Sequence, residues 1–322
     1  MVLGIWKMTF QYHLATSLKK DELWQQLATK TILEAAQSFL DTLTCHTKRS
    51  YRGSFNKIFE LLVSRDLLSP AMTLQTFSMC NLENLLDCIR TSVSGSNSTR
   101  QHRAASFVAF TQYLARTTQG MIKPVMPMKG GNNRTFVKIR DKAETEALTH
   151  EEYSKFIATL KKLSFRDYLI AKAIMQGAKR VNEVLLAKID QIDWEKNLII
   201  YNQSKSRAIE RITKIYYTDE FMNELRHYIY DRTDGHIFIS RNNSPVSQSQ
   251  IYRSFRYAGV LAGLTKQVHP HMLRSTCITL LMKMGYHSDE IMRVSGHSNP
   301  VSVIYYDKRP DEENISQRVR FA

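Results

Sequence analysis

Near its carboxy-terminal end the chain carries two histidines, an arginine and a tyrosine at spacings that would let them surround one phosphate. His271 and Arg274 are three residues apart, so on a helix they share one face. His297 follows a turn at Gly296, and Tyr306 comes nine residues after His297. Cations can hold phosphate oxygens while a phenol attacks phosphorus. The stretch is therefore a candidate site for breaking a phosphodiester bond.

This pattern is His-x-x-Arg, then Gly-His, then a tyrosine nine residues later. It resembles the carboxy-terminal signature of the tyrosine recombinases, the family of phage-type integrases and dimer resolvases. The resemblance implies that Tyr306, not its neighbour Tyr305, is the nucleophile. It also implies that Arg274 holds the scissile phosphate, and that His271 and His297 bind its oxygens and help to move the tyrosine proton.

A second segment, Gly177-Ala-Lys-Arg-Val-Asn-Glu183, resembles the family's first box, Arg-x-x-Glu. Arg180 would clamp the phosphate with two parallel hydrogen bonds, and Glu183 would help to orient the site. The family usually has one residue between the glycine and the arginine, whereas this chain has two. Lys179 is therefore an alternative to Arg180 as the phosphate ligand. A further alternative is that Arg180 is an ordinary solvated arginine on the surface of a helix.

The polar segment between two predicted strands, residues 202–211, carries further cations. The family places its catalytic lysine on this loop, which implies that Lys205 protonates the departing 5′ oxygen. Arg207 competes for the same role, and loop cations are often only solvated.

We expect the reaction to need no metal and no other cofactor. Positive charge on a phosphate can come from a metal, but the sequence shows no convincing cluster of carboxylates. A zinc site at His269, His271 and His297 would lack the ligand spacing of known sites. The sequence also has no Gly-x-x-x-x-Gly-Lys phosphate loop, and a phosphotyrosyl ester would keep the energy of the broken bond for rejoining without ATP.

The composition favours a nucleic-acid partner. Lys plus Arg number 45 against 30 for Asp plus Glu, which gives the 322-residue chain a net charge of +15. This charge favours double-stranded DNA over a membrane, although a basic protein without such a partner is the alternative. The four cysteines are scattered and are typical of a reduced protein. With neither a long apolar run nor a signal-peptide pattern, we expect a cytoplasmic location.

In the first half of the chain, apolar residues recur at the spacing of a helix. We expect helices over 32–43, 51–63 and 82–89, with a polar turn over Cys45–Ser50, a loop over Ser94–Ser98 and a fourth helix capped by Thr99. Basic residues at the helix starts favour a DNA clamp, and an ordinary helical bundle is the alternative. The order of elements loosely resembles the core-binding domain of the tyrosine recombinases.

The second half combines helices with a short β segment. Thr149 and Glu152 predict a capping box, an apolar helix follows over 165–178, and Arg180–Glu183 starts another. Residues 198–201 and 212–216 are typical of two strands, and helices resume from Asp219 and over 248–262. The sequence therefore predicts a mainly α fold with a small antiparallel β-sheet, in a two-domain architecture.

We divide the chain into five segments. They are an amino-terminal segment of unknown role (1–30), a helical DNA clamp (31–120), a basic interdomain linker (121–147), a catalytic domain (148–309) and a carboxy-terminal tail (310–322).

The family resemblance implies a site-specific DNA recombinase that works through a 3′-phosphotyrosyl intermediate. It further implies a homotetramer on paired DNA sites, with exchange through a Holliday junction. Within the family the chain most resembles an integrase carried on a plasmid, which implies a role in plasmid recombination or maintenance. Two alternatives stay open: a type IB topoisomerase, which acts as a monomer, and a non-catalytic DNA-binding plasmid maintenance factor.

Overall fold

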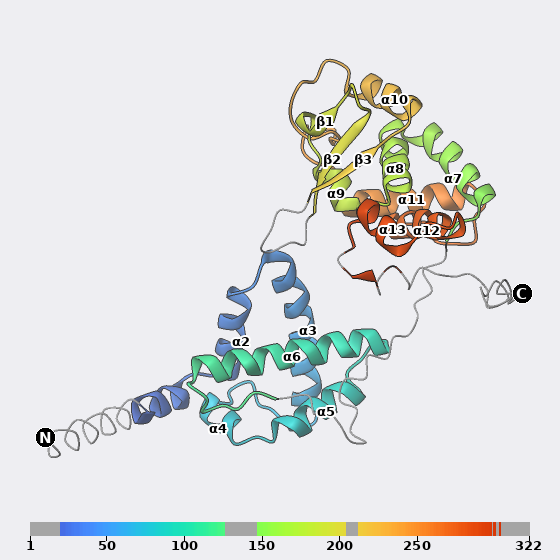
Figure 1. The fold of residues 1–322 in the computed structure, drawn as a ribbon. Coiled ribbons are helices and arrows are strands. Elements are labelled where there is room, and N and C mark those ends of the chain that lie inside the picture. Colours follow the sequence, from blue (N-terminus) through green and yellow to red (C-terminus); the bar gives the residue numbers. More distant parts are fainter. Residues whose placement is uncertain (1–19, 126–146, 204–211, 298, 301–302, 304–322) are drawn as a thin grey trace, which may run out of the picture. The chain divides into compact units, whose positions relative to one another are not determined.

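In the computed structural model the chain divides into two compact units, Met1–Asp141 and Lys142–Ala322, and each is described by itself. The structure describes residues 20–125, 147–203, 212–297, 299–300 and 303. These residues are mainly helical, with a three-stranded antiparallel sheet in the second unit (Figure 1). The predicted mainly α fold with a small antiparallel sheet is confirmed. Among the described residues, no helix combines the length and apolarity that crossing a membrane requires.

The first unit is a group of helices around one apolar core. Residues 20–29 are helical, and the helices that follow are α2 (Ile32–Asp41), α3 (Cys45–Ser64), α4 (Leu74–Ser78), α5 (Leu82–Ser92) and α6 (Asn97–Thr117). The long helix α6 packs against α2, α3 and α5 (Figure 1). Phe39, Phe55 and Phe110 are buried between them with ring centroids 5.4 to 6.1 Å apart, a separation typical of packed aromatic pairs.

Two local predictions in this unit were wrong. The segment Cys45–Ser50 is the start of α3 and not a turn, because Thr44 already has the extended backbone of a helix cap. Its polar residues are largely exposed, so they mark the solvent side of a helix. Helix α6 begins at Asn97, and its cap is Ser96, whose Oγ accepts from the Thr99 N–H at 3.3 Å. Thr99 therefore lies inside the helix.

The second unit surrounds a central helix. Its helices are α7 (His150–Leu163), α8 (Phe165–Gly177), α9 (Val181–Leu186), the 3-10 helix η1 (Ile189–Gln191), α10 (Asp219–Ile229), α11 (Gln248–Leu261), α12 (Pro270–Lys283) and α13 (Ser288–Ser295). The strands β1 (Ile192–Asp193), β2 (Leu198–Asn202) and β3 (Ile212–Tyr216) form a sheet in the order β1-β2-β3. The predicted capping box of Thr149 and Glu152 is present at α7. The sequence did not predict β1, α13 or, in the first unit, α4.

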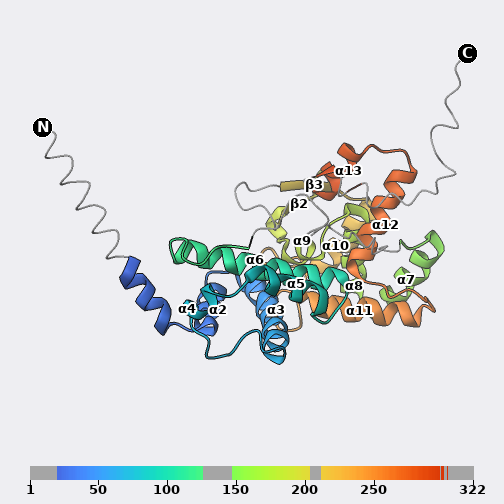
Figure 2. The same cartoon turned by 90° about the horizontal axis from the view of Figure 1, so that it is seen from below.

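Helix α8 is what brings the candidate residues together. Leu169, Ile170 and Ile174 along it are fully buried, and it packs against α7, α10 and α12. Helices α8 and α12 lie side by side in both views (Figure 1, Figure 2). The carboxy-terminal end of α8 therefore meets the amino-terminal half of α12. These are the positions at which the two sequence motifs place Arg180 and Arg274.

Candidate active site

The start of α12 presents His271 and Arg274 on one side of the second unit. Pro270 occupies the first turn, where its missing N–H is tolerated. His269 is the helix cap, since its Nδ1 accepts from the Met272 N–H at 3.2 Å. His271 is exposed, and partial burial of its ring, followed by the charge of Arg274, lowers the pKa of His271. His269 thus has a structural role at the helix start, while His271 is accessible.

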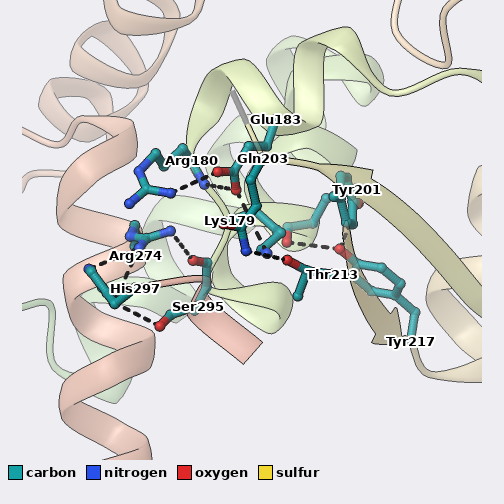
Figure 3. A network of polar contacts seen from close by, with 12 residues as sticks. Lys179, Arg180, Glu183, Tyr201, Gln203, Thr213, Tyr217, Arg274, Ser295 and His297 are labelled. Carbon is teal, nitrogen blue, oxygen red and sulfur yellow. Dashed lines mark hydrogen bonds and ion pairs between the residues drawn. The ribbon is translucent and has the colours of Figure 1, made fainter. Parts of the chain in front are cut away.

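Arg274 is almost completely buried, with 2 % of its surface exposed. Its Nη1 donates to the Ala178 carbonyl at 2.6 Å, at the end of α8. Its Nη2 lies 3.0 Å from Nε2 of His297 (Figure 3). These contacts fix the plane of the guanidinium in one orientation, which is the condition for a planar donor group to recognise an anion.

His297 contacts both Arg274 and Ser295. Arg274 Nη2, which can only donate, lies 3.0 Å from Nε2 and 3.4 Å from Nδ1 of His297, and Ser295 Oγ lies 2.7 Å from Nδ1. Burial first, and then the positive charges of Arg274 and Arg180, lower the pKa of His297 to about 3. The imidazole is therefore neutral at neutral pH.

The turn that carries His297 depends on a glycine. Helix α13 ends at Ser295, and Gly296 has a φ of 70° and a ψ of 30°, in the left-handed region. A Cβ at this position would lie 2.6 Å from Nε2 of Gln203, at the end of β2. The turn at the end of α13 therefore lies close to the Gln203 side chain at the end of β2, and its left-handed backbone favours glycine.

We expect Gly296→Ala to slow strand cleavage as well as to lower stability. The left-handed backbone alone costs about 1 kcal/mol for alanine, and Gly296 directly precedes His297, so strain in this turn would move the imidazole away from Arg274. Gly263→Ala is a matched control, because Gly263 has a φ of +73° but open space around its Cβ position. Urea unfolding should show a loss in both variants, whereas single-turnover cleavage should fall only in Gly296→Ala. Equal cleavage by the two variants would contradict this role of the turn.

In the first box Arg180 is partly exposed, whereas the alternative residue, Lys179, is buried. Arg180 caps α9, and 30% of its side chain is exposed. Its Nη1 binds Glu183 Oε1 at 2.8 Å, and its backbone N–H donates to the other carboxylate oxygen at 3.1 Å. The side chain of Lys179 is wholly buried. Of the two cations that the sequence left open, only Arg180 offers donors to a ligand in this structure.

The unusual spacing before Arg180 has a simple structural explanation. Ala178 stands two residues before Arg180, where the family usually has its glycine. It has a φ of 47° and is the left-handed cap of α8, a conformation that glycine adopts most easily. Compared with the family pattern, the chain between α8 and Arg180 therefore has no extra residue. Alanine occupies the glycine position, and its methyl group is buried beside Cys277 and Ile278 of α12.

The remaining predicted site residues lie outside the described part of the chain. These are Lys205 and its rival Arg207 on the β2–β3 loop, and Tyr306 with its neighbour Tyr305. Described residues next to these segments contact other parts of the second unit. Gln203 donates to Thr213 Oγ1 at 3.0 Å where the hairpin loop begins and ends. Val303, three residues before Tyr306, is fully buried in a cluster with α12 and α13.

Sequence reasoning missed several residues that shape the site. Ser295 and Gln203 gave no signal, because their roles depend on contacts between segments far apart in the chain. The burial of Lys179 was also missed, since lysine is rarely buried and the pattern offered no reason to expect it. Across the described residues, no three His, Cys, Asp or Glu side chains are grouped as they would be around a metal ion.

Comparison with known proteins identifies the family. The model of the phage integrase family matches residues 146–313, which is more than half of the chain. The chain belongs to the phage integrase family. This integrase is similar to the virulence plasmid integrase pGP8-D of Chlamydia muridarum, with 36% identity over 312 residues that cover 96% of this chain and 93% of the relative. It is also similar to the virulence plasmid integrase pGP7-D of Chlamydia trachomatis, with 34% identity over 282 residues that cover 86% of this chain and 90% of the relative.

A solved structure shares the fold of this integrase at low sequence identity. It is the XerH site-specific recombinase bound to a palindromic difH substrate in a post-cleavage complex. The TM-score is 0.62 at 16% identity, and the match covers 85% of this chain and 80% of that one. The predicted tyrosine recombinase architecture is confirmed by this likeness.

The comparisons also confirm the function class that the spacing predicted. This integrase is a tyrosine site-specific recombinase, an enzyme that breaks and rejoins DNA. The predicted resemblance to an integrase carried on a plasmid is confirmed as well, by the virulence plasmid integrases of Chlamydia. The type IB topoisomerase and the non-catalytic DNA-binding factor are not favoured. The individual site residues remain a proposal, which the geometry supports.

Proposed function

We propose that this integrase recombines plasmid DNA at a specific site, with Arg180, Lys205, His271, Arg274, His297 and Tyr306 as its catalytic residues. The observation that carries the proposal is the meeting of the two signature segments at the end of α8. Arg274 is bound to Ala178 there, two residues before Arg180. Two segments almost a hundred residues apart therefore present their arginines together. The plasmid role rests on the relatives, which are named virulence plasmid integrases.

In this proposal the two arginines bind the scissile phosphate. Attack on a phosphodiester adds negative charge to its non-bridging oxygens, and fixed donors stabilise that charge. Arg180 is held by Glu183 through its Nη1, and Arg274 is fixed by Ala178 and His297. A bound phosphate would offset the positive charges that depress the pKa of His297, so we expect this pKa to rise when DNA binds.

The chemical step follows from this arrangement. The Tyr306 oxygen attacks phosphorus and loses its proton to a neutral histidine, His271 or His297. The bond to the 5′ oxygen breaks, and Lys205 protonates that oxygen, with Arg207 as the alternative donor. The 3′-phosphotyrosyl ester keeps the bond energy. A 5′ hydroxyl of the other DNA strand can therefore attack it, release Tyr306 and restore a phosphodiester.

The domain assignment and the partners belong to the same proposal. Residues 31–120 would clamp double-stranded DNA, 121–147 would link the domains and 148–309 would carry out catalysis. The net charge of +15 supports a DNA partner. We propose a homotetramer on paired sites, in which the tail 310–322 docks on a neighbouring protomer. The enzyme would act in the cytoplasm, where its plasmid substrate is.

The test is to incubate the purified protein with its own plasmid and with an unrelated plasmid, and then to map nicks and covalent adducts. We expect adducts at a discrete position on its own plasmid only, and binding that weakens steeply with salt, because phosphate contacts release counterions. Relaxation of both plasmids without a preferred position would favour a topoisomerase. Specific binding without any adduct would favour a non-catalytic binder.

A further inference from the structure

Beneath the Arg180–Glu183 pair lies a lysine that the proposed mechanism does not use. The side chain of Lys179 is wholly buried, and its Nζ has no hydrogen-bond partner within the described part of the chain. Among the described residues, it is the one buried side-chain nitrogen or oxygen atom in this condition. An ammonium group out of water and without a hydrogen bond is costly, so its presence calls for an explanation.

The neighbours of Lys179 are one carboxylate, one aromatic ring and two further cations. Its Nζ lies 3.7 Å from Glu183 Oε2 and 5.7 Å from the centroid of the Tyr201 ring. The same carboxylate binds Arg180 through its other oxygen. Figure 3 shows Lys179 between Glu183 and Arg274, with the Tyr201–Tyr217 pair beyond it. The groups that face Lys179 are Glu183 and Arg180 from the start of α9, Arg274 from α12, Tyr201 from β2 and His297 from the turn after α13.

The charge of Lys179 determines the net positive charge of the first box, Gly177–Glu183, which carries Arg180. With the ammonium present, two cations share one carboxylate, and one net positive charge remains beside the phosphate site. Without it, Glu183 alone would neutralise Arg180 and would compete with the phosphate for its guanidinium donors. A buried interaction of this kind acts at low dielectric, where charges interact strongly.

The charge of Lys179 can change under ordinary conditions. Burial is the largest cause that lowers its pKa, and Arg274 and Arg180 lower it further, while Glu183 opposes them. The resulting pKa of Lys179 is about 8. The ammonium is therefore present at neutral pH and lost as the pH rises through about 8.

We propose that Lys179 is a positioning residue for strand cleavage: its buried ammonium neutralises Glu183, so that Arg180 keeps its charge and its donors for the scissile phosphate. The inference rests on the proposed role of Arg180. In this proposal Lys179 itself binds neither the phosphate nor the nucleophile, because its side chain is wholly buried. It acts only through Glu183 and Arg180.

The test compares Lys179→Met, which keeps the length of the side chain and removes the charge, with the wild-type protein. Single-turnover cleavage would be measured on the nicked duplex on which the wild-type protein forms its covalent adduct. At neutral pH we expect the variant to cleave about tenfold slower, with DNA affinity within about twofold. The ratio of the two rates should shrink toward one as the pH rises through about 8. Titration of Tyr306 or Lys205 affects both proteins and cancels in this ratio.

Lys172→Met is the matched control. Lys172 lies on α8, seven residues before Lys179. Its Nζ is paired with Glu220 and Glu224 at 3.1 and 2.9 Å, so its removal breaks ion pairs that do not involve Arg180 or Glu183. We expect this control to lower stability and to leave the pH dependence of cleavage unchanged. Lys179→Met should unfold close to the wild-type temperature, because the buried carboxylate of Glu183 keeps its bonds to Arg180 Nη1 and to the Arg180 backbone N–H.

The outcomes separate the inference from the proposed function. A wild-type rate and pH profile in Lys179→Met would overturn the positioning role, and so would failure of this variant to fold, which would make Lys179 a structural residue. A wild-type protein that forms no adduct on any duplex would instead overturn the proposed function.

Discussion

Replacing Arg274 with lysine should lower the rate of strand cleavage by about 100-fold or more, the loss typical of removing a fixed donor to a developing oxyanion. Lysine keeps the positive charge but has no planar fork. It cannot bond the Ala178 carbonyl and His297 and also present a donor to the phosphate. Single-turnover cleavage of the nicked duplex measures the effect, and DNA affinity should change little, because the charge is retained.

Arg226→Lys serves as the control for this substitution. Arg226 lies on α10 in the same unit, with its guanidinium 4.8 Å from the ring of Trp194, and it contacts none of the proposed catalytic residues in the described part of the chain. We expect this control to cleave within about twofold of the wild type. If Arg274→Lys cleaved as fast as Arg226→Lys, Arg274 would be a buried structural cation and not a phosphate ligand.

Tyr306→Phe should abolish the covalent adduct while leaving DNA affinity nearly intact. The substitution removes the attacking hydroxyl and no charge, and no alternative nucleophile stands at the family's spacing from His297. Tyr305→Phe is the matched control. Neighbouring residues on a helix point about 100° apart, so a site shaped for one phenol cannot use the other without rotation of the segment. The control should therefore still form the adduct, which a denaturing gel with labelled DNA would detect.

The adjacent tyrosines make this comparison informative. An adduct that survives in Tyr306→Phe and disappears in Tyr305→Phe would show that the nine-residue spacing selects the wrong phenol. Loss of the adduct in both variants, with both proteins folded and binding DNA, would show that the two hydroxyls act together.

The sequence was sufficient to predict the features that depend on neighbouring residues. The β-branched, apolar and aromatic residues of 198–201 and 212–216 predicted β2 and β3, because such residues favour strands through their own local conformational preference. The pairing of Thr149 with Glu152 predicted the start of α7 for the same reason. The separation of three residues predicted that His271 and Arg274 would lie one helical turn apart, which helix α12 confirms.

The sequence was insufficient where the outcome depends on distant segments. Ala178 adopts a left-handed backbone because its methyl group fits between α8 and α12, a contact that spans about a hundred residues of sequence. The burial of Lys179 follows from the same contact, since the left-handed turn at Ala178 directs the next side chain inward and exposes Arg180.

The central claim is that the carboxy-terminal spacing marks a tyrosine nucleophile in an arginine-lined site. The most direct measurement is to trap the wild-type protein on its nicked plasmid site, digest the adduct with protease and identify the modified peptide by mass spectrometry. We predict a phosphodeoxynucleotide on Tyr306, joined through the 3′ phosphate. The account would be contradicted by a nucleotide on Tyr305, by a 5′ phosphate linkage, or by the absence of an adduct on a site that the protein binds specifically.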